Sequence, residues 1–221
     1  MLPLAAAALA VYVGVLRVPP NVVPWGDIDL EQPPGPFARM QINGLVQSPQ
    51  ACFIALAGSS LEYRRIADRP VRDGCGFPNG VVVERSNVPY SSGFSASCPL
   101  AAALYVYERQ LRELARSHLG SDLARINHVG TYACRNVNGA TAGRRSQHAT
   151  ANAIDISGFT LADGRRISVL RDWGTDTPAG RFLADVRDEG CGLFNTVLGP
   201  EYNDRHQDHF HLDLGRFRIC R

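Results

Sequence analysis

Six cysteines spread along the 221 residues constrain this chain more than any other feature. No two of them form a Cys-x-x-Cys pair, so neither a zinc ribbon nor a thioredoxin-type redox site is indicated. An even number of well-separated cysteines is typical of a disulfide framework built in an oxidising compartment. The alternative is a set of reduced thiols buried in a cytosolic core. The cysteines are Cys52, Cys75, Cys98, Cys134, Cys191 and Cys220.

The disulfide framework can be connected in many ways, and sequence alone does not choose among them. We therefore take the simplest rule, in which each cysteine pairs with its neighbour along the chain. This rule predicts the bridges Cys52–Cys75, Cys98–Cys134 and Cys191–Cys220.

An uncharged apolar run occupies the N-terminus over residues 2–16, and Arg17 follows it. The run is shorter than the ~20 residues that span a bilayer, and it lacks the basic stretch that begins a standard signal peptide. We favour an uncleaved signal anchor over residues 1–18, with a cleaved signal peptide and a buried N-terminal helix as alternatives. An anchor would attach the protein to the inner membrane and place the rest of it in the periplasm.

Proline-rich sequence follows over residues 19–37. Because Pro19, Pro20 and Pro24 cannot propagate a helix, this stretch is expected to be an extended, partly polyproline-like spacer. The remaining residues, 38–221, show no internal repeat and no low-complexity stretch, so we expect them to form one domain.

The composition is that of a packed globular protein, with 45% hydrophobic and 20% charged residues. It excludes a disordered tail, a collagen-like fibre and a polytopic membrane protein. The 23 basic residues are all arginine, and the net charge is only +2. These arginines form no dense run, so a nucleic acid is not expected among the partners.

Helix and strand signals follow one another without regular β-α-β alternation. The clearest helix begins at Pro99 and ends at Gly120, because leucines recur there at steps of three and four residues. Two further helices are expected after Ser48-Pro49 and over Ala179–Arg187. Strands are expected at Val81–Val83, Ala124–Tyr132, Ala153–Ile156, Thr196–Leu198 and His209–Leu214. The sequence therefore predicts an α+β fold, with a small, mainly antiparallel sheet packed against helices.

Two short segments gather the residues that can carry chemistry. The first runs from Ser146 to Asp155 and contains His148, and the second runs from His206 to Asp213. His209 and His211 alternate along an expected strand, so both point to the same face of the sheet. A catalytic zinc ion takes three imidazole or carboxylate ligands and leaves one position for water. The two segments offer such ligands, although the same polar residues could instead satisfy buried strand ends.

A residue that accepts a proton would complete a hydrolytic site of this kind. Asp208 lies three residues before His211 and is the expected base. Of the two histidines in the His-x-His pair, one can bind the metal, while the other can contact the oxyanion of the substrate. Asp213, on the same face as His211, could orient a ligand imidazole or cap the strand end.

The pattern Ser-x-His-x6-Asp followed by His-x-His resembles the signatures of the zinc D-Ala-D-Ala peptidases and murein endopeptidases. The similarity covers roughly residues 126–213. It implies a zinc-peptidase-like fold in which His148, Asp155 and His211 hold Zn²⁺. It also implies that His209 is an auxiliary catalytic residue and that Asp208 is the base, where some members have glutamate.

Other residues of the two segments and the sequence around them are expected to contact the substrate. Arg135 is expected to pair with a substrate carboxylate or to stabilise the oxyanion, with a surface salt bridge as the alternative. Ser146 and Tyr202 are also expected to contact the substrate, with turn chemistry as the alternative for Tyr202. At Ala151 the peptidases usually have glycine, so the turn after His148 must accept a Cβ.

From about residue 35 to the end, the chain more narrowly resembles the bacterial extensin-like C-terminal domain family. The segments that carry this resemblance are Cys98-Pro99-Leu100, residues 130–135, residues 146–153, Arg171-Asp172-Trp173 and residues 198–203. The two resemblances imply a zinc-dependent hydrolase that cleaves an amide bond in peptidoglycan or another cell-wall peptide. A cell-envelope binding or structural module that keeps the fold and cleaves nothing is the alternative.

Overall fold

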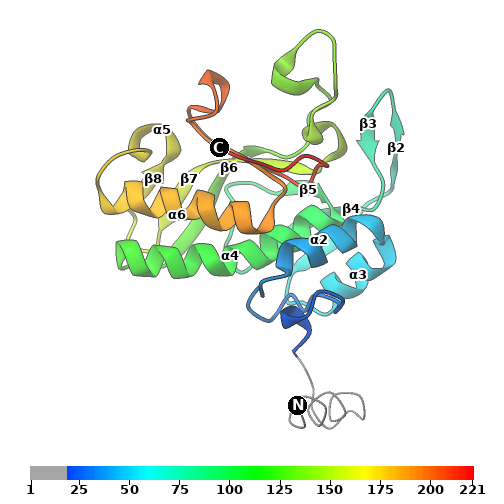
Figure 1. Ribbon diagram of the computed structural model, residues 1–221, viewed down its shortest axis with the longest axis horizontal. Coiled ribbons are helices and arrows are strands. Elements are labelled where there is room, and N and C mark those ends of the chain that lie inside the picture. The colour runs from blue at the N-terminus through cyan, green and yellow to red at the C-terminus, as the bar shows by residue number, and fades with distance from the viewer. Residues whose placement is uncertain (1–18) are drawn as a thin grey trace, which may run out of the picture.

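The computed structural model describes residues 19–221 (Figure 1). The predicted membrane anchor, residues 1–18, lies outside the described residues. Within residues 19–221, no helix is both long enough and apolar enough to cross a membrane.

The segment 19–37 is packed onto the domain, so the predicted extended spacer is wrong. It begins with a 3-10 turn, η1 (Pro20–Val22), and it buries Ile28 and Leu30 in the core. The Gln41 side chain donates to three backbone carbonyls of this segment, at distances of 2.9–3.1 Å. The proline content had indicated an open chain, but the apolar side chains between the prolines find room in the core.

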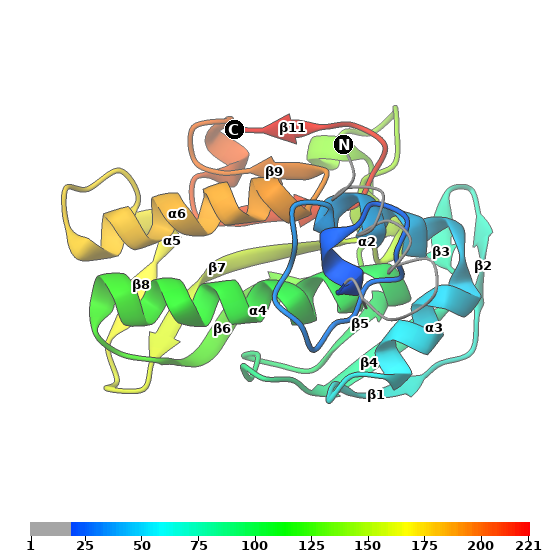
Figure 2. The ribbon, with the colours of Figure 1, turned by 60° about the horizontal axis from the view of Figure 1, so that its bottom comes forward.

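Four helices form one layer of the domain. They are α2 (Ala38–Gln47), α3 (Pro49–Ala57), α4 (Cys98–Leu119) and α6 (Pro178–Leu193). The helices α3, α4 and α6 begin within a residue of their predicted starts, whereas α2 was not predicted. Ser48, Ser97 and Thr177 cap α3, α4 and α6, each accepting a hydrogen bond from a backbone N–H of the first turn. A left-handed Gly120 ends α4. Figure 2 shows α4 and α6 side by side against one face of the sheet.

The main sheet has the order β11-β9-β10-β7-β6, and β8 pairs with residues 158–160 near the C-terminal end of β7. All its neighbouring pairs are antiparallel except β11 with β9. This arrangement confirms the predicted α+β fold. The strands are β6 (Leu123–Gly130), β7 (Ala153–Leu161), β8 (Arg166–Ser168), β9 (Thr196–Leu198), β10 (Phe210–Asp213) and β11 (Ile219–Cys220).

A smaller sheet and a hairpin complete the β structure at the other end of the domain. The small sheet has the order β1-β4-β5, and β2 pairs with β3. Short helical turns connect the main strands, and the loops that carry η2 and η4 rise above the same side of the main sheet (Figure 1). The remaining elements are β1 (Glu62–Arg65), β2 (Arg69–Arg72), β3 (Cys75–Phe77), β4 (Gly80–Arg85), β5 (Phe94–Ser97), η2 (Val137–Gly139), η3 (Gln147–Thr150), α5 (Val169–Asp172) and η4 (Asp204–His206).

Side-chain alternation in β10 separates the core from the functional face. Phe210 and Leu212 belong to the hydrophobic core, and Leu212 reaches Gly190 of α6. His211 and Asp213 lie at the alternate positions, so they point to the opposite face. The face that turns away from the helices therefore carries the polar residues of this strand.

Three disulfides use all six cysteines: Cys52–Cys98, Cys75–Cys134 and Cys191–Cys220. The neighbour rule is right for Cys191–Cys220 and wrong for the other two bridges. It fails because α3 packs against α4, whereas Phe77 of the β2–β3 hairpin packs on Tyr132 in the segment after β6. Tertiary contacts, and not closeness in sequence, bring these cysteines together.

Candidate metal centre

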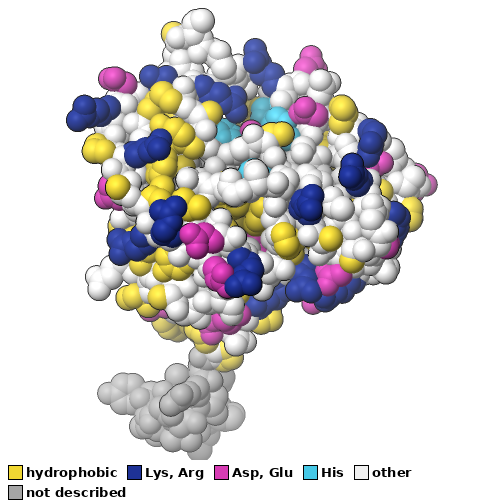
Figure 3. Space-filling view, turned by 180° about the vertical axis from the view of Figure 1, so that it is seen from behind, with side chains coloured by type: hydrophobic (Ala, Val, Ile, Leu, Met, Phe, Trp, Pro, Cys, Tyr) yellow, Lys and Arg dark blue, Asp and Glu magenta, His cyan; other side chains and the backbone are white. Residues whose placement is uncertain are grey.

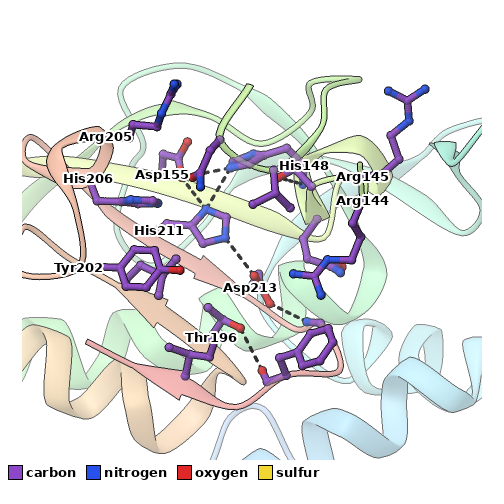
Figure 4. A pocket seen from close by; sticks show the side chains of 18 of the residues that line it. Arg144, Arg145, His148, Asp155, Thr196, Tyr202, Arg205, His206, His211 and Asp213 are labelled. Carbon is purple, nitrogen blue, oxygen red and sulfur yellow. Dashed lines mark hydrogen bonds and ion pairs between the residues drawn. The ribbon is translucent and has the colours of Figure 1, made fainter. Parts of the chain in front are cut away.

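A cleft of about 420 Å³ opens on the face of the main sheet that turns away from α4 and α6. Its walls come from the η2 and η3 loops, from β9 and β10, from the turn η4 and from the C-terminal segment. Figure 3 shows histidine side chains reaching the surface on this side, with arginines around them. Figure 4 shows His148, Asp155 and His211 close together in the cleft.

The turn η3 places His148 in the cleft. The Ser146 hydroxyl accepts a hydrogen bond from the His148 backbone N–H and so caps this turn. Ala151 then takes a left-handed conformation, with φ 51° and ψ 31°, and leads the chain into β7. This is the position where glycine would be the unstrained choice, and the chain accepts a Cβ there at a cost of about 1–2 kcal/mol.

Strand register brings Asp155 and His211 together. They are direct partners in the antiparallel pairing of β7 with β10, so their side chains lie next to each other on one face. Asp155 Oδ1 lies 2.9 Å from His211 Nδ1 and 3.1 Å from His148 Nε2. The two ring nitrogens are 3.1 Å apart. All three residues are buried.

Each imidazole uses its other nitrogen to bind an acceptor outside this triangle. His148 Nδ1 donates to the carbonyl oxygen of Thr131 at 3.0 Å. His211 Nε2 donates to the Asp213 carboxylate at 3.0 Å. With a neutral ring in each case, the proton is on the outer nitrogen, and the inner nitrogen presents a lone pair. The triangle then consists of three acceptors without a hydrogen between them.

Three acceptors at such short distances repel one another unless a positive charge lies among them. A tetrahedral zinc ion with ligands at 2.0–2.1 Å places neighbouring ligand atoms roughly 3.3 Å apart. The three distances, 2.9, 3.1 and 3.1 Å, are close to that value. The donor set of two imidazoles and one carboxylate also suits zinc, so the residues fit the predicted ion.

The charges around the cluster shift the pKa values of its members in the metal-free chain. Burial opposes ionisation of Asp155, but His148 and His211 outweigh it and hold the pKa of that carboxyl well below its usual range. Burial opposes protonation of His211, yet Asp155 and Asp213 raise its pKa to about 9. A proton on His211 is therefore the natural competitor of a cation at this site.

His209 and His206 lie beside the triangle. His209 Nε2 is 3.5 Å from Asp155 Oδ1, and His209 Nδ1 is 2.7 Å from Asp208 Oδ1. Burial, together with His209 and His211, lowers the pKa of His206 to about 4, so this ring is neutral at pH 7. The sequence placed His209 on the same face as His211, and the structure brings its ring to the cluster.

Asp208 does not enter the cleft. Its carboxylate is 61% exposed and contacts His209, and it lines a separate shallow hollow with Asn127 and Ser157. The geometry therefore connects Asp208 to the cluster only through the His209 ring. This position differs from that expected of a base that acts on the cluster directly.

The three residues predicted to contact the substrate all line the cleft, at different depths. Arg135 Nη2 lies 3.6 Å from Asp155 Oδ2 and is half-exposed. The Ser146 hydroxyl is engaged by the backbone of its own turn. Tyr202 lies on the rim, with its ring edge-to-face on His206.

Sequence reasoning missed several residues of the cleft. Arg144 and Arg145 directly precede Ser146, and this adjacency was the available signal. Arg205 and Arg216 carry no motif that would single them out. The Thr131 carbonyl could not be found at all, because a backbone acceptor leaves no trace in residue identity.

These observations define a class of protein: an α+β domain with a buried His–Asp–His cluster at the base of an arginine-lined cleft. The family described as Extensin-like protein C-terminus matches residues 50–221, and the chain therefore belongs to this family. No curated protein and no solved structure matches the chain.

Proposed function

We propose that this protein is a zinc-dependent hydrolase that cleaves an amide bond in a peptidoglycan peptide. The observation that carries the proposal is the triangle of His148 Nε2, Asp155 Oδ1 and His211 Nδ1, with both outer imidazole nitrogens bound to acceptors. When bound there, zinc would supply a Lewis acid that polarises a carbonyl and makes a water molecule nucleophilic at neutral pH.

His209 is the proton acceptor in this proposal. Asp208 accepts the hydrogen bond from His209 Nδ1, so Nε2 keeps its lone pair and faces the cluster. The imidazolium that forms when Nε2 takes a proton is stabilised by the Asp208 carboxylate. Asp208 thus acts through His209, and its exposed position is compatible with that role.

Arg135 and His206 shape the surroundings of the reacting amide. The Arg135 guanidinium is near the cluster and half-exposed, so it can donate to the oxygen of the substrate carbonyl as charge develops there. His206 stays neutral because its pKa is lowered, and it adds no positive charge that would repel the zinc ion. Both residues line the same cleft.

The substrate and the compartment are supported by different observations. Peptidoglycan is supported by the likeness of the Ser146–Asp155 and His209–His211 segments to the zinc D-Ala-D-Ala peptidases and murein endopeptidases. The periplasm is supported by the three disulfides, because such bridges persist in oxidising compartments. Attachment to the inner membrane through residues 1–18 completes the proposal.

The test is peptide release from purified peptidoglycan by the zinc-loaded full chain in mild detergent, followed by mass spectrometry. The wild type is expected to release peptides, and His148→Ala is expected to release none. His209→Gln is expected to lower the rate by about 10²–10⁴-fold, because a positioned base contributes that much. His118→Gln is the matched control, since His118 lies on α4 and pairs with Asp185.

Equal release by the wild type and His148→Ala would overturn the zinc mechanism. Zinc and peptidoglycan binding without any cleavage would instead identify a binding module of the cell envelope. A rate for His209→Gln equal to that of the His118→Gln control would remove His209 from the mechanism.

A further inference from the structure

The cleft contains more cationic side chains than the proposed mechanism assigns a role to. Five arginines line it, against two carboxylates, those of Asp155 and Asp213. Both carboxylates are buried and already engaged, Asp155 by the two cluster histidines and Asp213 by His211 and the Gly215 backbone N–H. The open part of the cleft therefore presents cations to any ligand.

Two of the five arginines form an ion pair or hydrogen bonds within the protein. Arg135 pairs with Asp155. Arg145 donates to the Asp73 carbonyl and to the Asn136 side chain, so it ties the hairpin loop to the cleft wall. Arg145 is therefore committed to the fold, and Arg135 lies next to the cluster, where the proposed mechanism already uses it.

Arg144, Arg205 and Arg216 differ from these two. Among residues 19–221, no carboxylate lies within ion-pair distance of any of the three, and all three are exposed. Arg165, by comparison, pairs with Asp163 at 2.6 Å. The cleft thus holds cations that the fold itself does not neutralise.

The Arg144 guanidinium is nevertheless held in place. It lies over the ring of Phe217, with 4.4 Å from Cζ to the ring centroid. Such stacking fixes the plane of the guanidinium and leaves its N–H edges free for a planar, bidentate acceptor. Phe217 comes from the C-terminal segment and Arg144 from the η2–η3 loop, so the contact joins two walls of the cleft.

Arg205 comes from another wall, the turn η4. Its Nη1 atom lies 3.7 Å from the place where a Cβ on Gly139 would be, so its side chain extends toward the η2 turn. In Figure 4, Arg144 and Arg205 lie on opposite sides of His148, Asp155 and His211. A chain laid across the cluster would therefore meet one unneutralised guanidinium on each side.

We infer that the cleft selects peptides that carry carboxylates on both sides of the amide at the metal centre, with Arg144 and Arg205 as the two recognition residues. This inference rests on the proposed function, because the cluster defines where the amide lies. Arg144, stacked on Phe217, holds one carboxylate through paired N–H···O bonds. Arg205 attracts the second from the opposite wall. A guanidinium presents paired N–H groups that match the two oxygens of a planar carboxylate.

The test is a binding measurement that does not need catalysis. Calorimetry with the full chain compares the blocked peptides acetyl-Glu-Ala-Ala-Glu-amide and acetyl-Gln-Ala-Ala-Gln-amide, in zinc-loaded and in chelator-treated protein. The acidic peptide is expected to bind about tenfold more tightly than the amide peptide. The Arg144→Gln variant is expected to lose most of this preference, and Arg205→Gln part of it. Arg125→Gln is the matched control, because Arg125 is exposed on β6 and outside the cleft.

Equal binding of the two peptides by the wild type would overturn the inference, as would an unchanged preference in Arg144→Gln. Phe217→Ala, which leaves the arginine in place, should weaken the preference if stacking prepares the guanidinium. Inorganic phosphate is the competitor in a further titration. If its affinity for the cleft exceeds that of the acidic peptide, the subsite binds phosphorylated ligands, and the proposal is overturned. If the chain prefers the acidic peptide but neither binds zinc nor cleaves peptidoglycan, the carboxylate subsite stands and only the hydrolase proposal is refuted.

Discussion

At the scale of single residues, the outer hydrogen bonds of the two histidines decide what the cluster can bind. When both rings are neutral, Thr131 and Asp213 accept the outer hydrogen bonds, so both inner nitrogens face Asp155 as acceptors. Neither partner touches the space within the triangle. Changing an outer partner should therefore alter cation binding without removing a ligand.

Asp213→Asn is expected to weaken zinc binding by about 10–100-fold. The Asp213 carboxylate accepts from both His211 Nε2 and the Gly215 N–H, whereas an asparagine has one acceptor oxygen. Its amide nitrogen would then face His211 and shift the ring proton to Nδ1, where it blocks the cation. Competition with a chromophoric zinc chelator measures the effect. Asp163→Asn, at an exposed site, is the control, and equal affinities for the two variants would contradict this role.

At the scale of elements, α4 carries a buried acid that the cleft does not use. Glu108 is 1% exposed and accepts hydrogen bonds from the Ser86 and Tyr90 hydroxyls and from the Val88 N–H. It thereby ties the loop between β4 and β5 to the helix. Burial raises its pKa from 4.5 to about 7, although these hydrogen bonds oppose the shift.

This raised pKa predicts a loss of stability as the pH rises. The folded protein holds the Glu108 proton more tightly than the unfolded chain does. The contribution of this proton to the free energy of unfolding is therefore full below pH 4.5 and is lost as the pH passes 7. The slope is at most about 1.4 kcal/mol per pH unit. Urea unfolding measures the free energy of unfolding between pH 5 and pH 8. This free energy should decline less for Glu108→Gln than for the wild type. Parallel declines would contradict the assignment.

The elements themselves were largely predictable, for local reasons. Ser48-Pro49 predicts the start of α3, Pro99 predicts the start of α4, and Gly120 predicts its end. The strand β10 follows from the alternation around His211. The packing of residues 19–37 was not predictable. Composition indicates how an isolated segment behaves, but it does not show whether the rest of the fold offers a surface for its apolar side chains. Two disulfides were missed because their partners meet only through tertiary contacts.

At the scale of the whole molecule, distant segments meet at the cleft. The cluster residues His148, Asp155 and His211 were expected from their motif, and strand register explains why two of them are neighbours. The charged rim was not expected, because its arginines come from separate loops. The Cys75–Cys134 bridge fixes the segment that leads into Arg135, next to the cluster. The fold thus joins a cluster that a motif predicts to an arginine rim that no motif predicts.

Zinc K-edge X-ray absorption of the zinc-loaded full chain tests the central claim most directly. We expect one zinc per chain, with only nitrogen and oxygen ligands at about 2.0–2.2 Å and the scattering pattern of two imidazoles. His211→Ala should lose the metal or one imidazole from this pattern. A chain that holds no zinc after dialysis, or an absorption spectrum that His211→Ala leaves unchanged, would contradict the account.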